Sequence, residues 1–572
     1  MRKLGWFLLT RLFAGLPFKF RVLCRQYMLR VIDLESLSVD ADVTAYLGQF
    51  AGIAIMGSAI HSVVAWAYMA PMKPEARLGY AWHFDQYLIA IMMLVVGLFA
   101  VVSWDSTFPD RRDIMVLAPL PITARCILFA KLAASGAILG IAVLAINVFS
   151  GFIWPFAVGI ANGGWPGFFR AVAAYWFTMV AAALFLYCCV LTVQGTVNLV
   201  LPRRWSLLAS AFLQLAAFGA FFTTYFLQGT LTSPAEITAP RNQFLLAVSP
   251  SFWFFALFNQ VNGTLPSYLV WLAQRAWIGL GVAIIGAVSS LLLCYLHAMR
   301  RMAEASDLVP GAGRFQDLLR IGSSLQIAIL QFVLRTLARS RQHRIILAFY
   351  LSIAFAIALN VVRKGIAAGA PRPFTAEFPL VTSLIMIFAV MGFVNVFSLP
   401  VSLTANWVLR TTQIWSSDRY IAATGQTLLL LSVLPSWLVS AGLGMTFRPL
   451  SLVAAHLGVL AFFGLIMAEA SLVGFQKIPF TCSLLPGNTN VQFVFWRTLG
   501  GVILLSVFIS SSEIPALHSR PLYVALVAVM FTAAAVLSVY NRRRAKSALL
   551  YYEELPDEAI TSLKLISPPI ET

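Results

Sequence analysis

Long apolar runs constrain the fold of this chain more than any other feature of its sequence. Twelve runs are long enough to cross a bilayer, which takes about 20 residues in an α-helix. In hydrocarbon each backbone amide needs an internal hydrogen-bond partner, and a helix provides that partner within one segment. We therefore expect helical spans at 45–69, 86–104, 126–150, 168–191, 205–228, 268–297, 344–362, 378–399, 426–446, 449–470, 492–511 and 520–540.

The composition agrees with a membrane protein. Of the 572 residues, 60% are hydrophobic and only 11% are charged, whereas an ordinary soluble domain carries about 25% charged residues. The net charge of +18 would suggest a nucleic-acid partner for a soluble protein. Here the basic residues lie at the ends of apolar runs. We therefore predict an all-α polytopic protein that contacts a lipid bilayer and no nucleic acid.

The distribution of Lys and Arg predicts how the chain is oriented. If both termini are cytoplasmic, the cytoplasmic segments carry 28 basic residues and the outer segments carry eight. This arrangement places the polar stretch 103–132 in the cytoplasm. It places the long loop 229–267 on the outer side.

Two short echoes indicate an internal duplication. The sequence QYMLR at Gln26–Arg30 returns as QFVLR at Gln331–Arg335, and each lies shortly before the first span of a six-span set. The sequence LPIT at Leu120–Thr123 returns as LPVS at Leu399–Ser402, each after the second span. Their common order favours two parallel six-helix repeats, although chance similarity between apolar segments is the alternative.

The duplication defines the expected domains, each half beginning with an amphipathic surface helix. In the first of these helices, 18–32, helical spacing places Phe20, Leu23, Tyr27 and Val31 on one face and arginines on another. The expected domains are a first half at 1–297, a cytoplasmic linker with the second surface helix at 298–343, a second half at 344–540 and a cytoplasmic tail at 541–572.

Common catalytic motifs are missing from the chain. It contains no GxxxxGK[ST] phosphate loop, no HExxH and no GxSxG, so we expect neither bound ATP nor catalytic residues. The histidines and cysteines are scattered without metal-ligand spacing, and we expect no metal. Among the acidic residues only Glu469 falls well inside an expected span, while Asp85 and Glu513 fall at edges. An ion-coupled secondary transporter stays possible but has few carboxylates to use.

The outer loop supplies candidates for a gate. The segment SPSFWFFALFNQVNG contains Pro250, Trp253 and Phe254, and Arg275 follows near the outer end of the next span. The aromatics are typical of a short helix or hairpin at the membrane interface. Arg275 could face an anionic substrate, or its side chain could extend to the interface.

A dense polar stretch follows the second span. Five charged residues fall within nine positions, and a proline-bounded turn comes next. The charged residues are Asp105, Asp110, Arg111, Arg112 and Asp113, and the turn contains Pro119, Leu120 and Pro121. A stiff charged element of this kind can pair with a complementary soluble partner. The alternative is a simple turn whose arginines set the topology.

The stretch DRRDIMVLAPLPIT…AKL, from Asp110 to Leu132, resembles a pattern in the permease subunits of type-2 ABC exporters. The surface helix before the first span and the aromatic segment before the sixth resemble the same family. The whole chain then resembles two permease halves fused together. The second half carries LPVSLTANWVLR without a preceding acidic cluster, and its possible docking residues are Leu399, Pro400, Ser402 and Arg410.

The resemblance implies a function. A separate cytosolic ABC ATPase, expected in two copies, would bind ATP and magnesium and would dock on the cytoplasmic loops. The chain would be a multi-pass exporter permease of the bacterial cytoplasmic (inner) membrane. The alternatives are an ion-coupled secondary transporter and a membrane protein with an assembly or sensing role.

Overall fold

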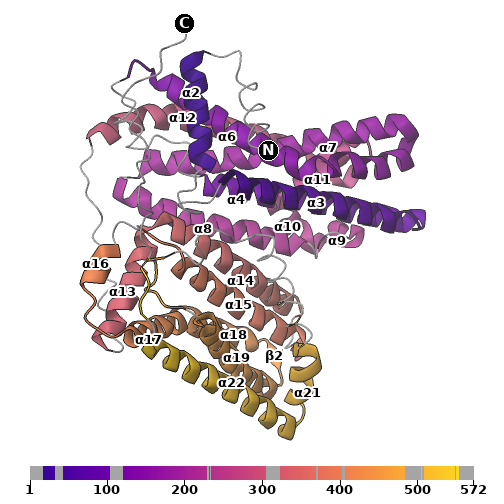
Figure 1. Cartoon of the computed structure of the whole chain (residues 1–572). Helices are drawn as coiled ribbons and strands as arrows, with labels where there is room; N and C mark the ends of the chain where they lie inside the picture. Colours follow the sequence, from indigo (N-terminus) through magenta and orange to yellow (C-terminus); the bar gives the residue numbers. More distant parts are fainter. Residues whose placement is uncertain are drawn as a thin grey trace.

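A computed structural model shows the protein as a bundle of long helices (Figure 1). It describes residues 17–32, 43–103, 120–201, 203–228, 231, 233–304, 323–368, 372–401, 406–473, 475–482, 501, 504, 508–547 and 549–552.

The first half of the described chain contains the surface helix, the long helices and a series of short ones. The elements are α2 (Phe18–Ile32), α3 (Val43–Met69), α4 (Pro74–Val102), α6 (Ala124–Asn147), α7 (Ser150–Val200), α8 (Arg203–Gln228), α9 (Pro234–Thr238), η2 (Pro240–Asn242), α10 (Gln243–Val248), α11 (Pro250–Asn262), η3 (Ser267–Leu269) and α12 (Val270–Glu304).

The second half of the described chain begins with α13, at the place where the sequence predicts the second surface helix. Its elements are α13 (Ser324–Arg339), α14 (Arg341–Ala368), β1 (Arg372–Pro373), α15 (Glu377–Phe397), α16 (Asn406–Thr411), α17 (Ser417–Leu428), η5 (Leu429–Val433), α18 (Leu434–Gly444), β2 (Phe447–Arg448), α19 (Leu450–Ser471), η6 (Ile509–Glu513), α21 (Ile514–Leu517) and α22 (Arg520–Ser547). The two short strands pair in parallel.

The helices confirm an all-α polytopic membrane protein. Within the described residues, nine helices are long and apolar enough to cross a membrane, or ten if a pair bent by 95° counts as one span. Eleven of the twelve expected spans fall on helices of the structure. The expected span 492–511 lies largely outside the described residues, so the count of twelve stays a prediction.

Several expected boundaries differ from the structure: α4 begins at Pro74 instead of 86, and α7 ends at Val200 instead of 191. Helix α12 continues to Glu304, past the expected end at 297, and α22 continues to Ser547, past the expected end at 540. Basic residues lie in the last turn of α22. Cations are favourable at a helix C-terminus, and their long stems can cover apolar surface. The helices therefore extend beyond their apolar runs into the polar flanks.

The stretch between the third and fourth expected spans is helical. Helix α7 contains a break at Gly163 and Gly164, and Gly164 has a φ of 61°. Glycine adopts this left-handed conformation without steric cost. A Cβ at Gly159 would lie 2.7 Å from the Cα of Phe168. The residues before the break therefore form a short helix that folds closely against the beginning of the long one.

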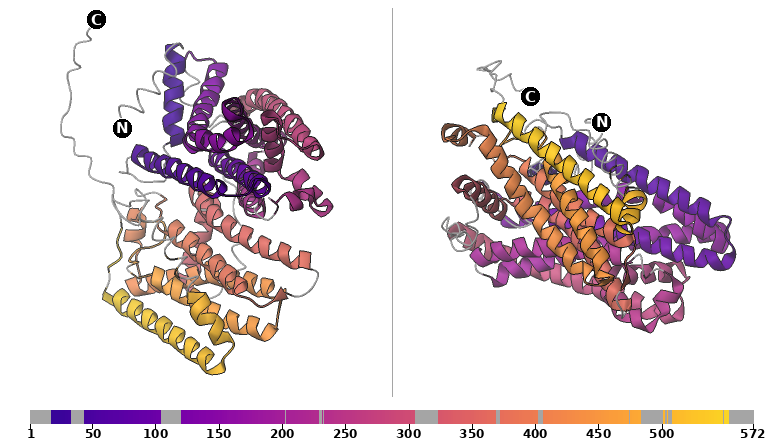
Figure 2. Two further views of the ribbon diagram at one scale, coloured as in Figure 1. Left: turned by 90° about the vertical axis from the view of Figure 1, so that its right-hand side faces the viewer. Right: turned by 90° about the horizontal axis from the view of Figure 1, so that it is seen from below.

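The two halves meet along α8 and α14, which pack closely together. The Phe222 ring of α8 makes an edge contact with the Phe349 ring of α14, with centroids 5.4 Å apart. Figure 2 shows the first half on one side of this contact and the second half on the other. The buried core of the first half extends across the contact to Ala348 and Ala356 of α14.

Short elements gather at opposite ends of the bundle. Helices α9, α10 and α21 and strand β2 lie at one end, which we call the α9 end (Figure 1). Helices α2, α13 and α16 lie at the other, which we call the α2 end. Candidate sites are found at both ends.

Candidate functional site

The expected docking loop is described only where it joins α6. Asp105, Asp110, Arg111, Arg112, Asp113 and Pro119 lie outside the described residues. Leu120 and Pro121 are exposed, and the Lys19 ammonium donates to the Pro121 carbonyl over 3.4 Å. The surface helix α2 therefore contacts the turn that ends the loop.

Helix α2 is fixed against α6 by a small apolar cluster. Leu23, Cys24, Tyr27 and Met28 are buried in it, and the Lys131 ammonium lies 5.1 Å from the centre of the Tyr27 ring. Burial raises the pKa of the Cys24 thiol to about 11, so this thiol stays protonated and serves packing. The predicted apolar face is confirmed at Leu23 and Tyr27.

The second predicted docking loop also lies beside a surface helix. Helix α13 packs against α17, and its Ile329 and Val333 are buried. The His343 ring, at the start of α14, forms a 2.9 Å hydrogen bond with the Leu399 carbonyl. Pro400 is half-buried. Ser402 lies outside the described residues, and Arg410 lies in the last turn of α16.

A loop after α19 anchors this second site. The Phe480 amide donates to the Phe397 carbonyl (3.0 Å), and the Val401 amide donates to the Phe480 carbonyl (3.1 Å). The Lys477 ammonium donates to the Cys482 carbonyl over 2.8 Å. The Tyr551 carbonyl accepts from the Cys482 thiol. The loop, the Leu399 turn and the described end of the chain are thus joined by hydrogen bonds.

At the α9 end, the predicted gate residues meet at a sharp bend. Residues Pro240–Asn262, which we call the bent segment, turn by 95° between α10 and α11. The Trp253 indole N–H and the Arg275 guanidinium both donate to the Ala247 carbonyl, over 3.1 and 2.9 Å. Pro250 begins α11. Three of the four predicted gate residues therefore lie around the bend, and Arg275 supports the backbone there.

The fourth gate residue, Phe254, lies in the core. It is fully buried, as are Phe252 and Phe255 on the same helix. Helix α11 packs among α4, α7 and α12. The sequence suggested an interfacial helix for these aromatics, whereas the structure places them between long helices.

Buried polar side chains lie beneath the bent segment. The Gln86 amide donates to the Ser251 hydroxyl over 3.2 Å, joining α4 to α11. The Trp154 indole N–H donates to the Asp85 carboxylate over 2.6 Å. Asp85 is 4% exposed. A charge or dipole at this depth requires such partners.

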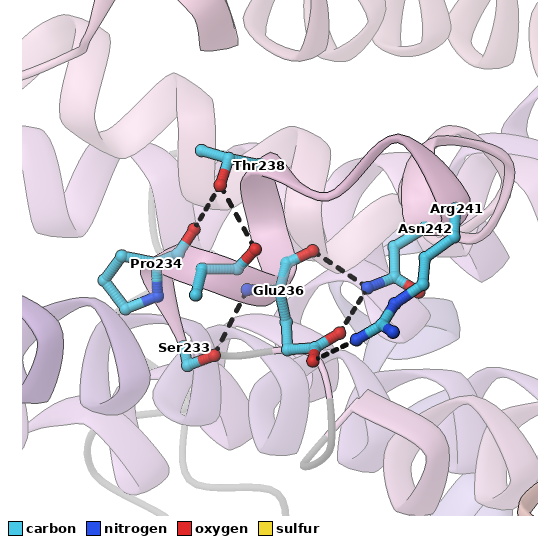
Figure 3. Close-up of polar contacts among 7 residues, drawn as sticks. Ser233, Pro234, Glu236, Thr238, Arg241 and Asn242 are labelled. Atoms are coloured by element: carbon cyan, nitrogen blue, oxygen red, sulfur yellow. Dashed lines mark hydrogen bonds and ion pairs between the residues drawn. The ribbon is translucent and has the colours of Figure 1, made fainter.

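Helix α9 and the first turn of the bent segment, η2, form a polar cap (Figure 3). Glu236 accepts hydrogen bonds from the side chains of Asn242 and Arg241, while Ser233 caps α9 by accepting from the Glu236 amide. The Asn242 hydrogen bond, with help from Arg241, lowers the pKa of Glu236. The carboxylate is therefore ionised at neutral pH and orders the turn.

The second half contains a buried cluster that the sequence analysis missed. His456 of α19 lies between Glu513 of η6 and Thr382 of α15, with contacts of 2.5 Å and 2.7 Å. All three side chains are at most 2% exposed. They are 57 and 74 residues apart in the sequence, so spacing could not reveal them. The sequence feature that could have indicated the cluster was Glu513, an ionisable residue at the edge of an apolar run.

An apolar groove in the second half could hold a ligand. It has a volume of about 440 Å³ and lies along the π-helical turn η5 and the adjoining helices. Apart from one amide, its lining would suit a hydrocarbon chain. The apolar groove is lined by Gln426, Leu429, Leu430, Val433, Leu434, Trp437 and Ala461.

Within the described residues, no three His, Cys, Asp or Glu side chains converge to hold a metal ion.

Comparison with family models, with curated proteins and with solved structures found no match to this chain. The geometry and the sequence patterns therefore carry the functional argument.

Proposed function

We propose that this chain is the permease of an exporter that a separate cytosolic ATPase drives. The observation that carries the proposal is the pairing of surface helix and turn in both halves. Helix α2 packs on α6 beside Pro121. Helix α13 packs on α17, and its Ile329 and Val333 share a buried cluster with Phe397, which precedes the Leu399 turn. A soluble partner would thus find two comparable docking sites at the α2 end.

The packing of the long helices supports two six-span repeats. In the first half α7 contacts α4 and α12, and in the second α19 contacts α15 and α22. Likewise α11 contacts α12, and α21 contacts α22. These matched contacts fit a parallel duplication. One chain would then supply both halves of the transport pathway, with the α8–α14 contact between them.

The docking sites provide a route for movement. The charged residues Asp105–Asp113 would pair with complementary charges on the ATPase. A push on this loop would pass through the turn at Pro121 to α6 and to α2, which the buried cluster holds together. Cycling between two membrane-domain states would require a ligand that binds these states with different affinity. The second site lacks the acidic cluster, so the two sites would bind the ATPase differently.

The orientation of the proposed permease follows from the basic residues. The α2 end would face the cytoplasm of a bacterial cell, with both termini on that side of the inner membrane. ATP and magnesium would be bound by the ATPase, because the chain lacks a phosphate loop.

Purification from native membranes tests this function. The wild-type chain is expected to retain a cytosolic ABC ATPase, and Arg111→Glu combined with Arg112→Glu is expected to insert normally but lose it. A matched charge reversal at the other end, Lys73→Glu with Arg520→Glu, should retain the partner. Absence of any ATPase under conditions that preserve comparable complexes would contradict the proposal. Equal ATPase recovery with both double variants would remove the loop from the docking surface.

A further inference from the structure

The cluster of Thr382, His456 and Glu513 joins three elements at the α9 end. Thr382 comes from α15, His456 from α19 and Glu513 from the π-helical turn η6. Their side chains are 0%, 1% and 2% exposed. Buried ionisable groups in a membrane domain are costly and are retained where they have a task. The proposed ATPase docking leaves this cluster unused.

One arrangement of donors and acceptors satisfies every hydrogen bond of the cluster and sets its number of protons. The Thr382 hydroxyl donates to the Phe378 carbonyl over 2.9 Å, so its oxygen is left to accept from the Nε2–H of His456. The remaining contact joins Nδ1 of His456 to Oε1 of Glu513. That contact needs one further proton, carried either by the imidazole or by the carboxyl group. With this proton the cluster has no net charge.

Loss of the shared proton would change the cluster. The Thr382 hydroxyl could rotate to donate to Nε2, and the Nδ1–H would then face an ionised Glu513. One negative charge would remain in a buried site, which costs several kcal/mol unless water or a cation reaches it. The bond from Nδ1–H would offset part of this cost, and exposure of Glu513 to water would remove the rest.

Within the part of the chain that the structure describes, the basic group linked to this site by ring contacts already has an acidic partner. The Arg372 guanidinium pairs with Glu377, and ring contacts lead from it through Phe447 and Phe378 to His456. The Tyr523 hydroxyl donates to the Ala455 carbonyl. Other described ionisable groups of the second half at this end include Arg448 on β2, His518 after α21 and Arg520 on α22. Asp418, Arg419 and Glu469 lie toward the α2 end of α17 and α19.

The element that carries Glu513 is short, and its described buried apolar residues are Ala516 and Leu517 of α21. Helix α21, which follows η6, has only four residues, and Ile514 packs against the small cluster around Ile387. Ser511 and Ser512 beside Glu513 are exposed. The carboxyl group thus has a short path from His456 to the surface.

We propose that Thr382, His456 and Glu513 form a binding site for one proton, and that release of this proton frees η6 and α21 from α19. The site holds the turn closed when it is protonated and lets it move when it is not. The proposal goes beyond ATPase docking, because it gives the α9 end of the second half its own response to pH.

Hydrogen–deuterium exchange on the full chain in lipid nanodiscs tests this site. Glu513→Gln keeps a neutral hydrogen-bonding group beside His456 and should hold η6 closed at every pH. At about pH 6 the amides of 509–517 should exchange alike in wild type and in Glu513→Gln. At about pH 9 they should exchange at least about tenfold faster in wild type than in Glu513→Gln at the same pH.

A matched variant and an internal control complete the test. Glu469 accepts from Asn541 near the α2 end of α19, so Glu469→Gln should respond to pH as wild type does. If Glu513→Gln fails to fold, the pH dependence of exchange in the wild-type protein tests the proposal. Its 509–517 amides should then respond to pH, after correction for intrinsic exchange, while those of α11 should not. Equal responses in both segments, no response, or the same response in Glu513→Gln would overturn the proposal.

Discussion

Each half of the molecule places a short segment before its last long helix, and the two segments are held in different ways. In the first half, α11 has 13 residues and buries three phenylalanines completely. In the second half, η6 and α21 together have nine residues, and their deepest polar contact is the pair of Glu513 and His456. The first segment is packed through large rings, whereas the second buries, among its described apolar side chains, only the smaller ones of Ala516 and Leu517 and, by our proposal, depends on a proton-bearing hydrogen bond.

The difference shows how one arrangement can give a rigid and a movable element. A close-packed aromatic helix resists displacement, because every shift loses many van der Waals contacts. A segment held by a titratable pair can be released by a change in protonation alone. We therefore expect the first half to provide the rigid frame at the α9 end and the second half to provide the movable part.

Removing a ring from α11 should give the largest effect. Phe255 is fully buried and makes an edge contact with Trp82. Truncation to alanine should lower the free energy of unfolding by about 3–5 kcal/mol, as for other buried phenylalanines. Thermal unfolding of the detergent-solubilised protein measures the loss.

Two variants sharpen that result. Phe244→Ala removes the same ring from α10, where the side chain is 75% exposed, and should change little. Ile514→Ala in the second half should cost only about 1 kcal/mol, because its site is half-buried. If Ile514→Ala cost as much as Phe255→Ala, the contrast between the two segments would disappear.

Removing the partner of Asp85 should give an intermediate effect. Trp154→Phe keeps most of the buried ring but loses the N–H that donates to the carboxylate. The free energy of unfolding of this variant should be lower by about 1–3 kcal/mol, which is the cost of leaving a buried acceptor unpaired. Trp277→Phe is the matched control, because its indole N–H bonds Gln260 at an exposed position. A larger loss in Trp277→Phe would contradict this reading of the core.

The polar cap should give the smallest effect. The pKa of Glu236 is lowered in the folded protein, so its contribution to stability is present above the ordinary glutamate pKa. That contribution is lost as pH falls through the lowered pKa. After correction for intrinsic exchange, the amides of 233–243 in wild type should exchange faster below about pH 4 than at neutral pH. The same amides in Glu236→Gln should show no such pH dependence. If Glu236→Gln showed the same acceleration at low pH, the effect would come from a titratable group other than Glu236.

The sequence predicts most of the fold, because the signals for it are local. An apolar run of sufficient length has few alternatives to a membrane helix, and the helical spacing of Leu23 and Tyr27 identifies the buried face of α2. Whether α11 lies in the core or at the membrane interface cannot be predicted from its own residues. An aromatic run such as that around Phe254 has the same composition at a membrane interface and in a core, and only the packing of α4, α7 and α12 decides between them.

The sites could be predicted only in part. The turns at Pro121 and Leu399 are visible as echoes in the sequence, and the structure places a surface helix near each. The cluster of His456 and Glu513 depends on the approach of α19 and η6, which no spacing encodes. The meeting of Trp253 and Arg275 on one carbonyl likewise follows from the bend between α10 and α11.

Site-specific photocrosslinking in native membranes tests the proposed function most directly. A photoreactive residue is placed at Leu120 or at Val401, both exposed at the α2 end, and at Phe244 at the α9 end as a control. The account predicts that an ABC ATPase is crosslinked from Leu120 and from Val401 and not from Phe244. Crosslinks from none of the three positions, in membranes that contain the assembled protein, would contradict it.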